Sequence, residues 1–201
     1  TPMFTHNTMD FEDRKRAMEA SFTAIMQNLG LDLKDDSLQD TPKRVTKMYM
    51  QEIFYGLDYR NFPKCTTNSN KFGYNEMLVE PKITVSSTCE HHFVCIDGFA
   101  KIAYIPKDKV IGLSKLHRVT EFFSKRPQVQ ERLTVQIYYA LSFILGTEDV
   151  AVEICADHHC VKSRGIKDTN SYTITRKMGG SFNNPIVRAE FMSSNHVNFE
   201  K

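Results

Sequence analysis

The chain changes to strand patterns at residues 77–106, which read MLVEPKITVSSTCEHHFVCIDGFAKIAYIP. Residues 77–88 are typical of a strand, and residues 93–106 hold two apolar runs on either side of Asp97-Gly98. An Asp-Gly pair between apolar runs is a common two-residue hairpin turn. We therefore expect a strand over 77–88 and a hairpin that turns at Asp97-Gly98, with Pro106 ending its second arm.

Upstream of these strands the pattern is helical. Residues 10–29 place apolar side chains at helical spacing. A second helix is predicted to start at Thr41-Pro42, a capping residue followed by proline at the first helical position, and to stop near Gly56. Residues 57–75 predict an irregular connection. The chain then divides into a helical N-terminal section with its connection, residues 1–75, and a second domain, residues 76–201.

Downstream, helices alternate with strands. Ser114 is predicted to cap one helix, and a longer helix follows and ends at Gly146. Strands are predicted over residues 149–157 and 171–176, and Asn184-Pro185 predicts the start of a short final helix. Because strands joined by tight turns need no crossover, this order predicts an α+β fold with an antiparallel sheet.

The composition is that of an ordinary globular protein. Apolar residues make up 41% of the chain and charged residues 25%, which argues against disorder, collagen and coiled coil. Lys and Arg number 26 against 24 Asp and Glu, an excess too small for a general nucleic-acid or membrane surface. The longest apolar stretch, residues 138–145, is far shorter than the roughly 20 residues of a bilayer span. We expect no nucleic-acid partner and no membrane association.

The cysteines and the first residues bear on the compartment. Five scattered cysteines, an odd number, do not suggest a disulfide framework. Residues 1–16 lack the apolar core of a secretory signal. We expect a cytoplasmic protein.

Two short segments carry potential metal ligands. Cys89-Glu90-His91-His92 follows the first predicted strand, and Cys-x-x-His is a spacing that can present sulfur and nitrogen to one zinc ion. Cys160 comes shortly after the strand over 149–157. With Cys89, His92 and Cys160 as ligands, Zn²⁺ would keep one position for water and lower the pKa of that water to about 7.

Other interpretations of these cysteines remain open. A closed four-ligand site is one, with Cys65 as a candidate fourth ligand. Cys95 and Cys155 are interpreted as packing residues, because Cys95 falls inside a hairpin strand and Cys155 alternates out of register with Cys160. A polar loop around a buried cysteine would explain Cys89 without any metal.

Two histidines next to these ligands are suited to proton transfer. His91 and His158 are candidate general acids and bases near neutral pH, or else they hold the ligands in place. If the strand continues past residue 157, its period of two places His158, Cys160, Lys162 and Arg164 on one face.

Basic residues predict an anion site. Ser114 at a helix start exposes backbone N–H groups, and Lys115 and Arg118 share a helix face. With Lys162 and Arg164 added, four cations would surround one pocket, which suits a triphosphate. A solvated basic helix end is the alternative.

The candidate base-recognition residue is Glu131. Its carboxylate can accept from the two N–H donors of a guanine edge, or it pairs with Arg132 on the surface. The sequence has neither a Walker loop nor a Rossmann loop, so side chains and a helix end would hold the phosphates.

Taken in order, these motifs resemble the GTP cyclohydrolase I family. The resemblance rests on residues 87–137 (STCEHHFVCIDGFAKIAYIPKDKVIGLSKLHRVTEFFSKRPQVQERLTVQI) and 156–166 (ADHHCVKSRGI), and on DDSLQDTPKRVTKMY and EIFYGLDY further upstream. It implies the tunnelling fold (T-fold), a four-stranded antiparallel sheet backed by two helices, with a helical N-terminal extension. It also implies a toroidal homodecamer whose active sites lie at subunit interfaces.

The resemblance assigns roles to individual positions. It implies zinc ligands at Cys89, His92 and Cys160, and catalytic roles for His91, His158 and Ser114, the last as a proton shuttle. The implied substrate contacts are Glu131 and Gln130 for guanine, Ser114, Lys115, Arg118 and Arg164 for triphosphate and ribose with Lys162 beside them, and Arg44 from a neighbouring subunit. His159 receives no role.

The implied activity is the zinc-dependent conversion of GTP and water into 7,8-dihydroneopterin triphosphate and formate, the first step of folate (pterin) biosynthesis. A non-catalytic, zinc-stabilised nucleotide-binding module is a competing class. A tunnelling-fold reductase that uses a nucleophilic cysteine and NADPH on a deazaguanine nitrile is another, and the paired Cys89 and Cys160 speak against it. A cyclohydrolase that prefers dGTP, or stops at the formamide, is a closer variant.

Overall fold

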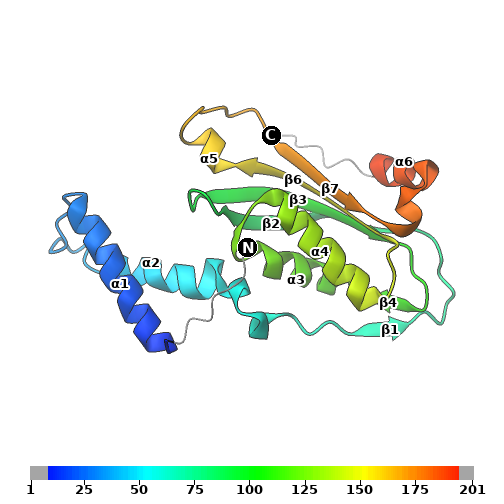
Figure 1. Ribbon diagram of the computed structural model, residues 1–201, viewed down its shortest axis with the longest axis horizontal. Helices are drawn as coiled ribbons and strands as arrows, with labels where there is room; N and C mark the ends of the chain where they lie inside the picture. The colour runs from blue at the N-terminus through cyan, green and yellow to red at the C-terminus, as the bar shows by residue number, and fades with distance from the viewer. Residues whose placement is uncertain (1–8, 195–201) are drawn as a thin grey trace.

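The computed structural model describes residues 9–194 and shows an α+β chain built on a five-stranded sheet (Figure 1). The strand order is β5-β2-β3-β6-β7. The strands are β2 (Leu78–Cys89), β3 (Cys95–Tyr104), β5 (Pro127–Gln128), β6 (Val150–His158) and β7 (Thr173–Met178). Four of them pair antiparallel, which confirms the predicted sheet. The two-residue β5 adds a parallel edge beside β2 that the sequence pattern does not predict.

The hairpin of β2 and β3 turns at residues 90–94, so the predicted turn at Asp97-Gly98 is wrong. β3 runs unbroken through Asp97-Gly98. A Cβ atom on Gly98 would lie 2.2 Å from the carbonyl oxygen of Cys155 in β6. Glycine marks a close approach of two strands here, and the same residue can mark a turn, so the local sequence does not distinguish them.

Two helices cover one face of the sheet. α3 (Leu113–Ser124) packs against β2, and α4 (Gln130–Leu145) packs against β6 and β7. The main core lies between these helices and the sheet. Its most buried members include Ile83, Val85, Ile102, Leu116, Phe122, Leu133, Ile137, Val152 and Ile154. These are the apolar positions of each helix and strand, and their burial fixes which strand residues face the helices.

The ends of α3 and α4 test two sequence predictions. α4 ends at Gly146, which has a φ of 68°, as expected of a glycine stop. α3 begins at Leu113 with Gly112 as the N-cap, so the prediction of Ser114 as the cap is wrong. Gly112 holds the extended cap conformation, and this places Ser114 inside the first turn.

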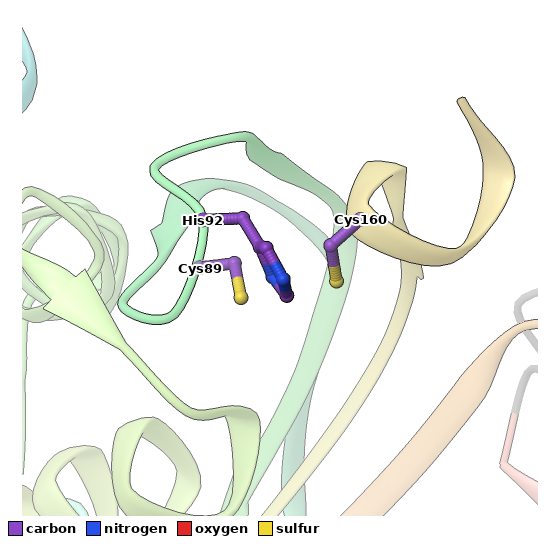
Figure 2. A group of neighbouring side chains, drawn as sticks. All are labelled: Cys89, His92 and Cys160. Atoms are coloured by element: carbon purple, nitrogen blue, oxygen red, sulfur yellow. The ribbon is translucent and has the colours of Figure 1, made fainter. Parts of the chain in front are cut away.

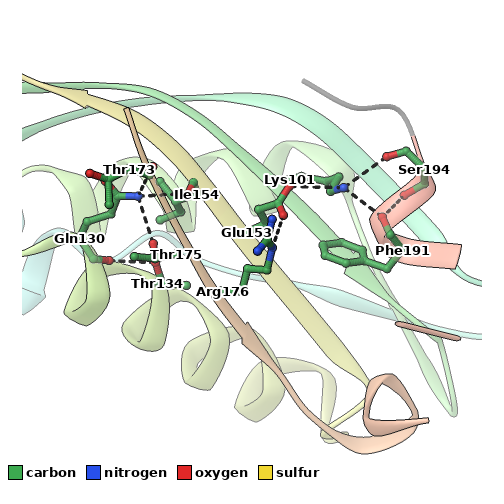
Figure 3. Close-up of polar contacts among 10 residues, drawn as sticks. All are labelled: Lys101, Gln130, Thr134, Glu153, Ile154, Thr173, Thr175, Arg176, Phe191 and Ser194. Atoms are coloured by element: carbon green, nitrogen blue, oxygen red, sulfur yellow. Dashed lines mark hydrogen bonds and ion pairs between the residues drawn. The ribbon is translucent and has the colours of Figure 1, made fainter. Parts of the chain in front are cut away.

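The other face of the sheet is covered at one end by the C-terminal elements, η4 (Gly180–Asn183) and α6 (Pro185–Ser193). The Asn184 side chain accepts from Ile186 N, which confirms the predicted capped start of α6. Lys101, only 1% exposed, donates to the carbonyl oxygens of Phe191 (3.0 Å) and Ser194 (3.3 Å) at the end of this helix (Figure 3). Its charge is balanced by Glu153 at 3.4 Å.

The N-terminal helices form an arm beside the sheet (Figure 1). α1 (Phe11–Asn28) is capped by Asp10, and α2 (Thr41–Lys47) continues as a π-helix, η1 (Met48–Ile53), where a single α-helix was expected. Ring contacts at centroid distances of 5.0–5.4 Å then lead from the arm to the β2–β3 turn, through Phe22, Tyr49, Phe54 and Phe93. The division of the chain at residue 75 stays a prediction.

Short elements complete the chain. η2 (Tyr55–Leu57) lies where the second predicted helix was expected to stop. The expected irregular connection, residues 57–75, contains η3 (Tyr59–Asn61) and β1 (Thr67–Ser69), and β1 pairs with β4 (Lys109–Ile111). α5 (His159–Lys162) follows β6 directly. Within residues 9–194, no helix is both long and apolar enough to cross a bilayer.

Candidate metal centre and active site

Cys89, His92 and Cys160 come together at one end of the sheet, with their side chains directed toward one another (Figure 2). Their ligand atoms all lie within 4.8 Å of one another. Cys89 is the last residue of β2, His92 lies in the β2–β3 turn, and Cys160 lies in α5. Two sulfurs and one imidazole nitrogen form a donor set that suits Zn²⁺.

Backbone hydrogen bonds hold the turn that carries the first two ligands. Cys89 N donates to Val94 O at 2.8 Å, and Phe93 N donates back to Cys89 O at 2.9 Å. Glu90 lies inside the same turn and forms an ion pair of 2.6 Å with Arg132 of α4. The hydrogen bond from Arg132 lowers the pKa of Glu90, so the carboxylate stays charged and ties the turn to the helix.

Cys160 reaches the group because the chain turns into a helix after His158. The strand ends at His158, so the condition under which Cys160, Lys162 and Arg164 would share a strand face with His158 is not met. Burial raises the pKa of the Cys160 thiol, and the nearby Cys89 thiol raises it further. A bound divalent cation would reverse this preference, since positive charge stabilises thiolates.

His158 is held in one orientation by Gln130, a residue only 1% exposed. Gln130 Nε2 donates to Ile154 O (3.1 Å), Thr173 O (2.9 Å) and Thr175 Oγ1 (3.1 Å) (Figure 3). Carbonyl oxygens only accept, so the amide must point its Oε1 toward His158, whose Nε2 lies 2.8 Å away. His158 Nε2 consequently carries a proton, which leaves Nδ1 as the nitrogen able to accept one.

The charge state of His158 follows from its surroundings. Burial lowers the pKa of His158, and the negative charges of Glu131 and Asp157 oppose that shift without cancelling it. The neutral ring is therefore favoured near pH 7. Glu131 itself is exposed at the start of α4, on the same side of the molecule as the metal group. His91, also exposed, has its Nδ1 3.8 Å from Cys89 Sγ.

Matches to known proteins bear on this cluster. A family model described as GTP cyclohydrolase I matches residues 18–196. The chain belongs to the GTP cyclohydrolase I family. It is 54% identical over 194 residues to GTP cyclohydrolase 1 of Aeromonas hydrophila, covering 96% of this chain and 88% of that protein. It is 55% identical over 194 residues to GTP cyclohydrolase 1 of Tolumonas auensis, covering 96% and 89%.

Membership of the GTP cyclohydrolase I family establishes the enzyme class and the fold of this protein. It is a hydrolase with the tunnelling fold, which confirms both predictions from the sequence. Among solved structures, the apo form of the archaeosine synthase QueF-Like resembles it with a TM-score of 0.42 and 13% identity, over 52% of this chain and 95% of that one.

The predicted phosphate residues on α3 of this family member lie away from the metal group within one chain. Tyr104 pairs with Leu78, so it lies at the end of the sheet where β2 begins. Its hydroxyl accepts a hydrogen bond from Ile111 N, and α3 begins two residues later, so the start of α3 lies at that end. At the other end of α3, Ser124 O accepts from Ser87, near Cys89. The twelve-residue helix spans about 18 Å. Its first turn therefore lies at the opposite end of the sheet from the metal ligands.

This placement divides the predicted phosphate contacts into separate groups. Ser114, Lys115 and Arg118 belong to the first half of α3, whereas Lys162 and Arg164 follow Cys160. The four cations therefore do not surround one pocket in a single chain. Arg44 is exposed on α2 in the N-terminal arm.

Cys65 lies with the α3 cations. Burial raises the pKa of Cys65, and the charges of Lys115 and Arg118 oppose that shift, so these side chains are close to it. In the part of the chain that the structure describes, Cys65 is not a member of the Cys89, His92 and Cys160 group. Residues 9–194 of one chain thus present three ligands there, and the four-ligand alternative with Cys65 is not supported.

Proposed function

We propose that this enzyme converts GTP and water into 7,8-dihydroneopterin triphosphate and formate in a zinc-dependent reaction, as the first step of folate (pterin) biosynthesis. The observation that carries the proposal is the meeting of Cys89, His92 and Cys160 beside His158. Zn²⁺ held by these three ligands would supply an activated water for attack at C8 of guanine.

The chain's own residues then move protons and hold the substrate. Nδ1 of His158, with His91 as the second candidate, exchanges protons with the imidazole nitrogen of guanine and the ribose ring oxygen as those rings open. Glu131 accepts from the guanine edge, close to His158. Gln130 acts mainly by orienting His158, because its side-chain amide is fully engaged inside the protein.

The triphosphate is bound by cations from more than one subunit. Ser114, Lys115 and Arg118 cannot meet the metal group of their own chain, so a second copy must bring the first half of α3 to it. Lys162 and Arg164 come from the chain that carries Cys160, and Arg44 comes from a further neighbour. Ser114 also moves a proton in the later rearrangement. We accordingly propose a homo-oligomer with sites at its interfaces, and a homodecamer as its form.

Binding both ends of GTP positions its reacting atom. Contacts with guanine and the triphosphate hold C8 near the metal, so that remote binding energy lowers the barrier of the chemical step. All five cysteines are free, which fits the reducing cytoplasm that we propose as its location.

The test is a metal-dependence assay with GTP. We expect formate release and pterin absorbance to disappear with a chelator and to return with added Zn²⁺. Cys160→Ser should lose activity and metal from this centre together. Cys155→Ala is a matched control, because Cys155 is a buried β6 cysteine outside the metal group and should keep both. Full activity in metal-free protein would refute the proposed water activation.

A further inference from the structure

A second group of potential metal ligands lies close to the first and shares no residue with it. Cys95 and Asp97 of β3 and His159 of α5 have ligand atoms within 4.8 Å of one another. His159 Nε2 is 2.7 Å from Asp97 Oδ1. The side chains of Asp97 and His159 are 53% and 44% exposed, so a dissolved ion can reach them.

The strand period keeps the two groups apart. Ile96 is 1% exposed and packs into the core under α3 and α4, so Cys95 and Asp97 on either side of it point to the opposite face of the sheet. Cys95 is exposed there, which makes its interpretation as a packing residue wrong. Cys160, in contrast, packs against the main core together with Cys89. The adjacent residues His159 and Cys160 thus serve different groups.

The second group combines donor types that suit a cation, although the charge of Lys125 also acts on Cys95. Asp157, the cross-strand partner of Asp97, is neutralised by an ion pair with Lys162. Asp97 Oδ1 lies 2.7 Å from His159 Nε2, and both side chains are partly exposed, so an ion can enter between them. Thiol, carboxylate and imidazole together are the donor types that Zn²⁺ and similar borderline divalent cations take.

We propose that Cys95, Asp97 and His159 bind a second divalent cation of the zinc type, with water completing its coordination. The ion replaces the proton of the Cys95 thiol, which passes to solvent, and separates His159 from Asp97 enough to bond both. It then links the start of β3 to α5. Because Cys160 follows His159 directly, this link steadies one ligand of the first centre.

Metal stoichiometry tests the proposal without an activity assay. We expect the purified protein, equilibrated with excess Zn²⁺ and dialysed, to retain one more equivalent per chain than Cys95→Ser or Asp97→Asn. Co²⁺ should give a sulfur-to-metal charge-transfer band from this group that persists in Cys160→Ser and vanishes when Cys95→Ser is added. Cys160→Ser tests the first centre and Cys95→Ser tests the second. The second centre can therefore be judged even if the first centre binds no metal and the proposed function fails.

A matched control comes from another histidine–carboxylate pair. His117 Nε2 lies 3.0 Å from Glu80 Oε1 with a similar exposure of 48% for the histidine, and this pair belongs to no ligand group within residues 9–194. His117→Gln should leave the Zn²⁺ content unchanged, whereas His159→Gln should lower it by one equivalent. Equal metal content in wild type, Cys95→Ser and His159→Gln would show that Asp97 and His159 form only an ion pair and would overturn the proposal.

Discussion

Gln130 Oε1 accepts from His158 Nε2 at 2.8 Å, and the other end of the same amide is fixed by three acceptors from β6 and β7. This hydrogen bond selects one tautomer of His158. Gln130 could therefore orient the histidine instead of contacting guanine. The two roles predict different changes in kcat and KM, so kinetics can distinguish them.

Gln130→Met should lower kcat about 10- to 100-fold with little change in KM, since an orienting partner is lost and guanine binding is not. Steady-state kinetics with GTP measure both constants. Gln128→Met is the control, because Gln128 is equally buried but bonds to Phe123 O and Gln136 instead of His158. A raised KM at constant kcat would instead assign Gln130 to guanine.

Mixed oligomers test whether the active site is shared between chains. Cys160→Ser removes a metal ligand and Lys115→Ala removes a cation of α3, so each variant alone should be inactive or nearly so. Dissociated, mixed and reassembled at equal amounts, they should regain about a quarter of wild-type activity, because that fraction of interfaces combines two intact halves. Activity is followed as formate release from GTP.

The control for this experiment mixes two variants with the same defect. Cys160→Ser reassembled with Cys89→Ser should stay inactive, since every metal group then lacks a ligand. If the Cys160→Ser and Lys115→Ala mixture stays equally inactive while reassembled wild type recovers, each chain must build its site alone.

Gly98→Ala should destabilise the protein by about 1–3 kcal/mol, the usual cost of overpacking. The added methyl would lie 2.2 Å from Cys155 O and 2.5 Å from Ala156 Cα, so β3 and β6 must separate. Thermal unfolding measures the change. Gly112→Ala is the control, since a Cβ there meets nothing closer than 4.0 Å, and comparable melting temperatures for the two variants would contradict the steric argument.

Asp149 predicts a pH-dependent part of the stability. Burial disfavours its charge, but hydrogen bonds from Ser181 N and Lys107 outweigh burial and lower the pKa of Asp149. A lowered pKa in the folded state stabilises the fold above about pH 4 and loses this effect as the pH falls through the folded-state pKa.

Asp149→Asn should therefore lower the free energy of unfolding by about 1–3 kcal/mol at pH 7, because hydrogen bonds to a charged carboxylate are lost. The difference from wild type should shrink as the pH falls below about 4, because Asp149 takes up a proton first in the unfolded chain and only at a lower pH in the folded one. Denaturant unfolding at pH 7 and pH 3 measures the two differences. A difference that stays constant between these pH values would rule out the charge of Asp149 as the cause.

The sequence by itself determined the donor types and most of the elements. Cys-x-x-His at 89–92 and Cys160 were identifiable as potential metal ligands from their residue types, and the short spacing brings Cys89 and His92 together. The helices over residues 10–29 and 130–145 and the capped start at Asn184-Pro185 were also predictable, since helical period and caps are local properties.

The tertiary structure decided what depends on the approach of distant segments. Gly98 could either form a turn or allow β6 to approach closely. The position of the neighbouring strand decides between these two outcomes. The switch from strand to helix after His158 moves Cys160 to one side of the sheet and His159 to the other. The direction in which α3 runs along β2 separates Lys115 from Cys89. Each of these depends on strand register and packing between residues far apart in the chain, which periodicity along the sequence does not encode.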